Sequence, residues 1–366
     1  MKTMKSIQFF ALALVALTVA SCSTNDVIDN SDSGKKADVT ISLVGEQTRA
    51  TGAGNVTTEI AVTDFVAFVV DGEGDIIGTE YGVSPALTAT FTDISTTATE
   101  VYVVANTGAT ALNPGLFDGI TTLVGLQDVQ GDLGTEADGS TQTKDNLYMH
   151  GKGSISYTGA NGDGTARVTL KFSAAKIELT VVDNRSTTGV YTYSDHQVTV
   201  LNAGAHANFF AATPSTQSTF YTGAAAGLYN NPAAAQLRTY LNDNVVSSTS
   251  AAGAYHYYVF GNDVNAYDVA TKSPTIITVS SLRTPTAGGT AKRVFYPVHF
   301  SSIEDVTITG DGTWGTIAPG NNYAITITLT ENGSGVIDPE VPAIKADITV
   351  TVETTPWNPI TAGKDF

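Results

Sequence analysis

The chain has 366 residues, a formal net charge of −17 and only 14% charged residues. Its length exceeds that of one ordinary hydrophobic core and predicts two folded domains. Nucleic-acid phosphates are bound through Lys and Arg, so this acidic balance argues against a nucleic-acid partner. Threonine, alanine, glycine, valine and serine dominate, which favours short strands joined by turns over helices.

The N-terminus has the pattern of a secretion signal. Two lysines precede an apolar run over residues 7–19, which is too short to span a membrane. The run ends at Val19-Ala20-Ser21-Cys22, which is typical of a bacterial lipobox cleaved before the cysteine. Cys22 is the only cysteine, so it has no partner for an internal disulfide. We predict a lipoprotein signal peptide over residues 1–21 and lipidation of Cys22, in preference to an ordinary signal with an incidental cysteine.

Residues 22–49 are predicted to be a propeptide that contains the first strand. After a polar tether, four apolar residues alternate with polar ones and predict a strand that buries one face: Ala37, Val39, Ile41 and Leu43. Arg49 follows in a polar, glycine-rich stretch, which makes the Arg49–Ala50 bond an accessible target for a protease.

An N-terminal domain is predicted over residues 50–183. Its strands are expected at 62–70, which turns through 71–75 into 76–77, and at 89–92, 100–106, a hairpin after 146–151, and 167–182. The acidic turn 71–75 lacks the glycine and glutamate positions of a calcium loop, so a simple turn is predicted. Residues 111–133 are expected to form a helical or irregular insertion anchored by Leu112, Leu116, Leu123, Val124 and Leu126.

A polar, turn-forming cluster at residues 183–189 predicts the domain boundary. The C-terminal domain is expected over 184–335, and residues 336–366 are expected to form an extended arm that carries the last strand. The stretch 211–254 is interpreted as loops with one short helix near 233–241. Strands are predicted at 197–203, 255–260, 275–279, 293–300, 306–309 and 323–329.

The last strand repeats the first. Ala346, Ile348, Val350 and Val352 follow the same alternation as Ala37, Val39, Ile41 and Leu43, and both runs begin with Lys-Ala-Asp. A core tolerates volume-conserving swaps of apolar side chains, so the two strands could occupy one groove. Chance similarity between two β-strands is the alternative. Trp357 follows the last strand and is interpreted either as an interface anchor or as a residue packed on its own subunit.

No catalytic or metal-binding pattern is present in the sequence. The five histidines are scattered, and there is no His-Glu-x-x-His, no Gly-x-Ser-x-Gly and no P-loop. His256 and His299 lie inside aromatic β runs, where a packed histidine is expected rather than a ligand. We therefore expect no enzyme, no metal and no cofactor.

Several phrases resemble the fimbrillin family, the pilins of Bacteroidales such as those of the major and minor fimbriae of Porphyromonas. The resemblance spans nearly the whole chain. It rests, in chain order, on residues 101–106, 175–177, 295–299, 322–329 and the Pro356-Trp357 end. Two regions depart from the family pattern, Gly261-Asn262-Asp263 and the small-residue stretch 211–254. The resemblance implies an all-β fold of two tandem, transthyretin-like β-sandwich domains with an N-terminal lipoprotein leader and a C-terminal donor strand.

The resemblance also implies a mechanism. Family members are cut after an arginine by an arginine-specific, trypsin-like protease, and the strand removed is replaced by a donor strand from a neighbouring subunit. On this chain the cut would fall after Arg49, the removable strand would be that of Ala37–Leu43, and the donor that of Ala346–Val352 with Trp357. The chain would then be a shaft subunit of adhesive fimbriae. It would be a lipoprotein of the outer membrane first and part of an extracellular homopolymer later, with minor tip and anchor subunits as partners.

The alternative is a monomeric outer-membrane lipoprotein that binds glycans or host proteins through loops and aromatic residues such as Tyr255, Tyr257 and Tyr258. It predicts that Arg49 stays uncut and that the last strand pairs within its own chain.

Overall fold

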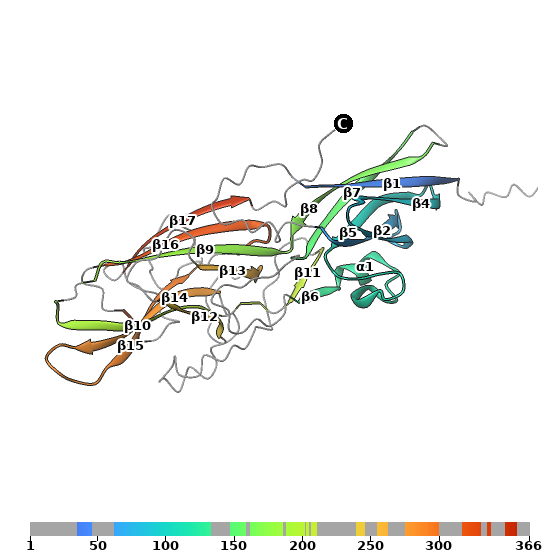
Figure 1. Cartoon of the computed structure of the whole chain (residues 1–366). Coiled ribbons are helices and arrows are strands. Elements are labelled where there is room, and N and C mark those ends of the chain that lie inside the picture. The colour runs from blue at the N-terminus through green and yellow to red at the C-terminus, as the bar shows by residue number, and fades with distance from the viewer. Residues whose placement is uncertain are drawn as a thin grey trace, which may run out of the picture. The chain divides into compact units, whose positions relative to one another are not determined.

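The computed structural model of the chain is almost entirely β-structure (Figure 1). It describes residues 35–45, 62–132, 147–158, 162–185, 188–201, 203–204, 206–210, 239–245, 255–262, 275–299, 317–330, 335–337 and 348–356. Cys22, Arg49, Ala50, Ala346, Trp357 and the predicted strand 306–309 lie outside these residues.

The N-terminal part forms one seven-stranded sheet in the order β3-β2-β5-β7-β8-β1-β4. The pair β1–β8 is parallel and the other pairs are antiparallel. The two strands at the ends of this order nevertheless touch, since a Cβ placed on Gly78 of β3 would lie 2.8 Å from Ile94 Cδ1 of β4. The sheet therefore closes around its core. Its strands are β1 (Lys36–Gly45), β2 (Asp64–Asp71), β3 (Ile76–Val83), β4 (Thr88–Ser95), β5 (Ala98–Ala105), β7 (Met149–Tyr157) and β8 (Gly164–Phe172).

The C-terminal part contains two four-stranded sheets, ordered β13-β9-β16-β17 and β12-β10-β14-β15. Alternate residues of β9 and β16 are buried in the same hydrophobic cluster as residues of β10 and β14, as expected for the inner faces of a sandwich. The predicted all-β sandwich fold is confirmed. The strands are β9 (Ala174–Asp183), β10 (Tyr191–Leu201), β12 (Thr239–Val245), β13 (Tyr255–Phe260), β14 (Ile276–Pro285), β15 (Lys292–His299), β16 (Asn321–Leu329) and β17 (Ile348–Pro356).

The run predicted as one strand over residues 167–182 is two strands that belong to different sheets. β8 ends at Phe172 and pairs with β1 and β7, whereas β9 begins at Ala174 and pairs with β13 and β16. The break at Ser173 is hidden in the sequence because apolar residues continue on both sides of it. The chain therefore passes from one sheet to the other at Ser173, before the domain boundary predicted at residues 183–184. The predicted domain limits stay predictions.

The insertion after β5 is partly helical, but most of its predicted anchors are wrong. It holds a 3₁₀ turn, η1 (Gly115–Phe117), and one short helix, α1 (Leu123–Gln127), capped by Thr122 Oγ1, which accepts the Gly125 N–H at 3.1 Å. Of the five predicted anchors Leu126 is buried and Leu123 partly buried, while the other three are exposed, with Leu112 at 99%. Phe117, which was not predicted, is buried 5.4 Å from the Phe68 ring. A five-residue helix is too short for periodicity to identify its inner face.

Two further elements differ from the sequence prediction. Residues 239–245 form strand β12, so the helix predicted near 233–241 is wrong at its C-terminal end; its other residues lie outside the described chain. A two-stranded sheet of β6 (Gln130–Asp132) and β11 (His206–Asn208) was not predicted. Three-residue strands carry too little alternation to be recognised from sequence.

Candidate functional site

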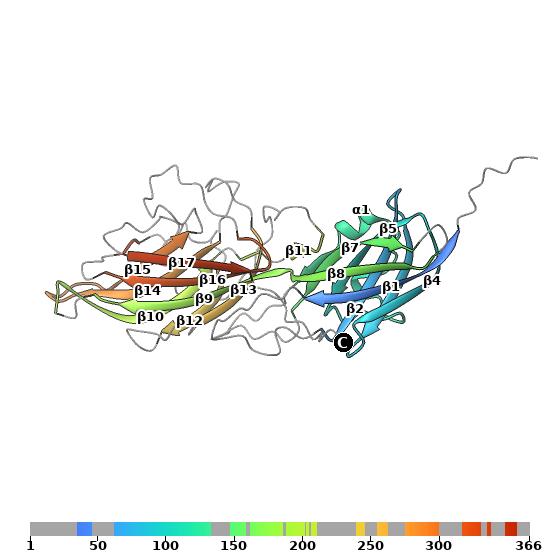
Figure 2. The ribbon, with the colours of Figure 1, turned by 90° about the horizontal axis from the view of Figure 1, so that it is seen from above.

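Strand β1 lies inside the seven-stranded sheet, between β8 and β4, as both views show (Figures 1 and 2). It pairs in parallel with β8 from Val39↔Gly164 to Gly45↔Leu170, and antiparallel with β4 from Lys36↔Ser95 to Ser42↔Thr88. Both of its edges are therefore hydrogen-bonded. The segment predicted to be removable is an integral strand of the uncut chain.

The inward side of β1 is formed by the four predicted residues. Val39 and Ile41 have no exposed surface, and Ala37 and Leu43 are each 7% exposed. The residues between them are exposed, so the alternation in the sequence matches the two faces of the strand. Burying three aliphatic side chains of this size stabilises the sheet by roughly 1.5–3 kcal/mol each.

Small residues of β8 make room for this side of β1. Val39 lies opposite Gly164 and Ile41 opposite Ala166. A Cβ on Gly164 would come within 3.1 Å of Val39 Cγ2, so this position is closely packed against β1. Any strand that replaced β1 would have to present side chains of nearly the same volume at these positions.

Strand β4 depends on β1, which the sequence did not reveal. In the sheet order β4 is the last strand, and among the described strands its ladder is made with β1. Additional bonds join the same region: Leu43 N–H donates to Leu87 O at 2.9 Å and Thr96 N–H to Lys35 O at 2.8 Å. Loss of β1 would therefore free the facing edges of both β8 and β4.

Strand β17 pairs with β16 of its own chain along its whole length, from Leu329↔Ile348 to Asn321↔Pro356. It is the last strand of its four-stranded sheet, so among the described strands β16 is its one neighbour. Val350 packs, partly buried, against the main hydrophobic cluster. This intrachain pairing is the arrangement that the monomeric alternative predicts.

The aromatic residues suggested for ligand binding are mostly inaccessible. Tyr257 and Tyr258 of β13 are 0% and 1% exposed, and Tyr255 is partly buried against the same cluster. The prediction that these tyrosines form a binding surface is therefore wrong for Tyr257 and Tyr258. Their positions in a six-residue aromatic run gave no sign of which face points inward, because the buried run Tyr257–Phe260 is continuous.

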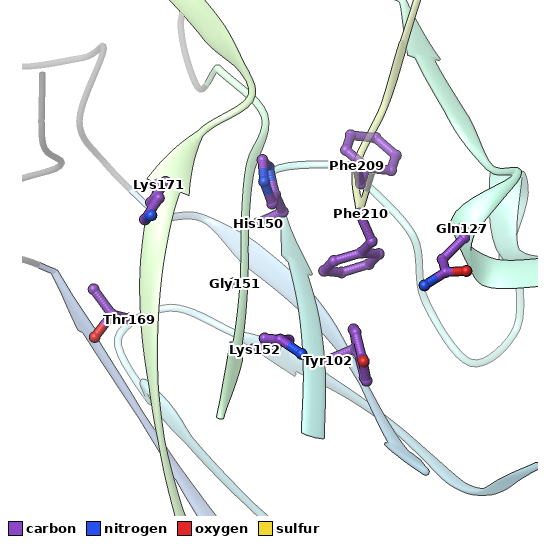
Figure 3. A pocket seen from close by; sticks show the side chains of 9 residues that line it. All are labelled: Tyr102, Gln127, His150, Gly151, Lys152, Thr169, Lys171, Phe209 and Phe210. Atoms are coloured by element: carbon purple, nitrogen blue, oxygen red, sulfur yellow. The ribbon is translucent and has the colours of Figure 1, made fainter. Parts of the chain in front are cut away.

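A cleft of about 400 Å³ lies on the N-terminal part beside α1 (Figure 3). Figure 3 shows the Phe210 ring between the side chains of His150 and Tyr102, and the Phe210 and Tyr102 rings meet edge-on at 5.0 Å. The lining residues are Tyr102, Gln127, His150, Gly151, Lys152, Thr169, Lys171, Phe209 and Phe210.

Two polar side chains of this cleft, Tyr102 and Lys152, share the partner Glu100. Tyr102 Oη donates to Glu100 Oε2 at 2.8 Å, and Lys152 Nζ contacts Glu100 Oε1 at 3.0 Å. Burial alone would raise the pKa of Glu100, but the hydrogen bonds from Lys152 and Tyr102 hold it below its usual value. Burial and the bond to Glu100 raise the pKa of Tyr102. Tyr102 and Lys152 are thus already engaged with Glu100, although a specific small-molecule site needs convergent polar groups to orient its ligand.

His150 beside the cleft makes the stability of the fold depend on pH. Its Nδ1 lies 2.9 Å from Ser173 Oγ, and burial, together with the positive charge of Lys171, lowers the pKa of His150 from 6.5 to about 4. Between these two values the unfolded chain binds more protons than the folded chain, so stability falls as the pH drops from 6.5 to 4. We expect this histidine to contribute up to about 3 kcal/mol to that loss.

The measurement is urea denaturation at pH 7.0, 5.5 and 4.5 for the wild type and His150→Gln. The variant should lose less stability between pH 7.0 and 4.5 than the wild type does. His206→Gln is the matched control, since His206 belongs to another short sheet. If the wild type and His150→Gln lost the same free energy of unfolding between pH 7.0 and 4.5, His150 would not be the source of the pH dependence.

The described residues hold no group of three or more His, Cys, Asp or Glu side chains that could bind a metal ion. Within the same residues no helix combines the length and apolar character needed to cross a membrane.

Comparison with known families covers most of the chain. Residues 37–181 match the family model of the major fimbrial subunit protein FimA, and residues 174–357 match that of the FimA-like major fimbrial subunit protein, C-terminal domain. The second match alone covers half of the chain. None of the curated proteins matches it significantly.

Solved structures agree with the family models. A candidate cell adhesion protein of Bacteroides eggerthii is 32% identical, with a TM-score of 0.69, over 89% of this chain and 97% of its own. A fimbrilin of Porphyromonas gingivalis is 19% identical, with a TM-score of 0.57, over 88% of this chain and 98% of its own. A candidate cell adhesion protein of Parabacteroides distasonis is 16% identical at the same TM-score, over 90% and 99%. The last two show the shared fold.

The two family matches together span residues 37–357. The alignment with the Bacteroides eggerthii protein covers 97% of that protein at 32% identity. Since the fold agrees as well, the chain belongs to the FimA-like family of major fimbrial subunit proteins.

Proposed function

We propose that the chain is a shaft subunit of adhesive fimbriae, exported as a lipoprotein on Cys22, cut after Arg49 and polymerised by strand exchange. The observation that carries the proposal is the position of β1. It is an interior strand with a buried inner side, and it ends at Gly45, four residues before the predicted cut.

Cleavage would leave β1 attached by hydrogen bonds and packing alone. Its departure would expose an apolar trough and the facing edges of β8 and β4, and such edges attract another strand. A neighbour's last strand could fill the trough by β-augmentation, with backbone hydrogen bonds providing affinity and alternate side chains fixing the register. Ile348, Val350 and Val352 would replace Val39, Ile41 and Leu43, which changes each position by about one methylene group or less.

Release of the donor requires β17 to leave β16. Of the strands that the structure describes, β17 pairs with one and β1 pairs with two. Exchange therefore breaks one ladder in the donor subunit and forms two in the acceptor. This difference favours the exchanged state once β1 has been removed.

Strand exchange of this kind is a head-to-tail contact that does not close, so a filament results. The filament would leave the outer membrane through an anchor subunit that keeps its lipid and end in a tip subunit. An arginine-specific protease would control assembly, because the uncut chain has its trough filled.

The proposal is tested by limited trypsin treatment of the purified chain, followed by N-terminal sequencing and size-exclusion chromatography. We expect a new N-terminus at Ala50 and a ladder of oligomers. Val350→Asp in the donor strand should abolish the ladder, because the carboxylate would enter an apolar trough. Thr351→Asp, one step out of the alternation, is the matched control and should still polymerise.

A labelled peptide of residues 345–356 provides an independent measurement. It should bind the cut chain and not the uncut one, since β1 occupies the trough before cleavage. A cut chain that stays monomeric at high concentration and binds no peptide would contradict the proposal.

One observation favours the second candidate, a monomeric surface lipoprotein: β17 pairs with β16 in its own chain. Under that function trypsin would leave Arg49 uncut, or the cut chain would remain a monomer. The same experiment therefore decides between the two.

A further inference from the structure

A lysine is completely buried at the start of the C-terminal sandwich. The side chain of Lys176 on β9 has no exposed surface, and its Nζ lies 3.3 Å from Glu178 Oε1, whose side chain is 11% exposed. Burying an ammonium group carries a large desolvation free energy even when the group is paired with a carboxylate. We therefore consider a chemical role for Lys176.

A carboxamide completes the group. Asn322 lies on β16, directly opposite Lys176 in the parallel β9–β16 ladder. Its Nδ2 donates to Glu178 Oε2 at 3.1 Å. The lysine amine and the asparagine carboxamide are therefore held by the two oxygens of one carboxyl group.

The carbonyl of this carboxamide is buried without a partner. Among the residues that the structure describes, no group donates a hydrogen bond to Asn322 Oδ1, and this atom is buried. A buried acceptor left unsatisfied is destabilising, so most native structures avoid it. The amine and the carboxamide thus share one carboxyl group on directly opposite residues of two paired strands, and the carboxamide oxygen has no described donor to hold it elsewhere.

The surroundings limit access of water. Tyr258 of β13 lies opposite Lys176 on the other side of β9 and is 1% exposed. Lys176 is fully buried, while Glu178 and Asn322 are partly buried. A site with little water favours transfer of a proton within an ion pair, because separated charges are poorly solvated there. It also protects an amide bond from hydrolysis.

From this arrangement we propose that Lys176 and Asn322 become joined by an intramolecular isopeptide bond, with Glu178 as the acid–base group.

The reaction needs no external reagent. Lys176 Nζ gives one proton to Glu178 Oε1, and the neutral amine attacks Asn322 Cγ. As the tetrahedral intermediate collapses, the Nζ–Cγ bond stays and the Cγ–Nδ2 bond breaks. A second proton from Nζ passes through the carboxyl group to Nδ2. Ammonia leaves, takes up the remaining proton as ammonium, and Glu178 returns to its carboxylate form.

The bond would join two strands that are far apart in sequence. β9 is the first strand of its sheet in chain order and β16 precedes the last one, β17. A covalent link here closes a long loop and restricts the unfolded chain, as a disulfide does. If the chain is a filament subunit, as proposed above, the link would also lie between the strand that enters the C-terminal sandwich and the strand next to the donor, where pulling force would be carried.

The test is the intact mass of the purified chain, measured after incubation until the mass no longer changes. We expect a value below the sequence mass by one ammonia molecule. Tryptic digestion of the denatured protein should give residues 172–185, uncut at Lys176, joined to residues 294–345.

Three variants, Lys176→Ala, Asn322→Ala and Glu178→Ala, should each have the full mass expected for their sequence. Lys152→Ala, which removes an exposed lysine that also pairs with a glutamate, should still lose one ammonia. The wild-type measurement does not depend on the folding of any variant. A wild-type chain with its full mass and trypsin cleavage after Lys176 would overturn the proposal, whether or not the chain polymerises.

Discussion

Replacing Ile41 with aspartate is expected to lower the free energy of unfolding of the uncut chain by about 4 kcal/mol or more. Ile41 has no exposed surface and lies between Ala166 of β8 and Ala89 of β4. The substitution removes a buried aliphatic side chain and places a carboxylate in the same apolar core. Two sheet partners would be affected at once, because β1 holds β4 against β8.

Urea denaturation of the uncut chain at pH 7 measures this loss. Ser42→Asp is the matched control: Ser42 is the next residue of the same strand and is exposed, so its substitution should change stability by less than about 1 kcal/mol. A loss below about 1 kcal/mol for Ile41→Asp would mean that β1 contributes little to the core.

The same variant connects stability with assembly. If β1 leaves after the cut at Arg49, the mature subunits from the wild type and from Ile41→Asp have the same sequence. Their filaments should then have the same thermal stability, although their precursors differ. A difference that persists in the filament would mean that β1 is retained.

Replacing Arg185 with alanine is expected to destabilise the C-terminal sandwich by about 3–5 kcal/mol. Arg185 is 7% exposed, and its Nε and Nη2 donate to the two carboxylate oxygens of Asp183 at 2.8 and 2.5 Å. Its Nη1 donates to Ser281 Oγ at 2.9 Å and to Tyr296 Oη at 3.0 Å. The guanidinium thus connects the end of β9 with β14 and β15. Its loss leaves the largely buried Asp183 carboxylate without its charged partner, with only the backbone N–H of residue 185 still donating to it at 3.0 Å among the hydrogen bonds described for it.

Thermal and urea unfolding of Arg185→Ala measure the effect. Lys152→Ala is the comparison, since Lys152 also pairs with a carboxylate, but its side chain is 58% exposed. Such a surface pair contributes about 0–1 kcal/mol. The double variant Arg185→Ala/Asp183→Ala should recover part of the loss, because it removes the isolated carboxylate. If Arg185→Ala and Lys152→Ala cost the same, the buried network is not important for stability.

The processing and exchange residues remain predictions. Cys22, Arg49, Ala50 and Trp357 lie outside the described chain. Val350 is the one predicted donor side chain that the structure describes, and its strand β17 pairs with β16 of the same chain. Conversely, the Arg185 network and the Lys176–Glu178–Asn322 group had no sequence signal. Their members are up to 146 positions apart. Strand pairing brings Lys176 and Asn322 together, and the packing of one sheet on the other brings Arg185 to Ser281 and Tyr296.

The sequence by itself determined the all-β class, most of the strands and the inner side of β1. Alternation with a period of two is a local property, and it reports directly which residues of a strand face the core. Tertiary structure alone decided that β1 lies between β8 and β4, that the chain changes sheets at Ser173, and that β17 pairs with β16. These pairings depend on hydrogen bonds between segments that are distant in the chain. The alternation of apolar and polar residues along a strand does not specify which other strand it pairs with.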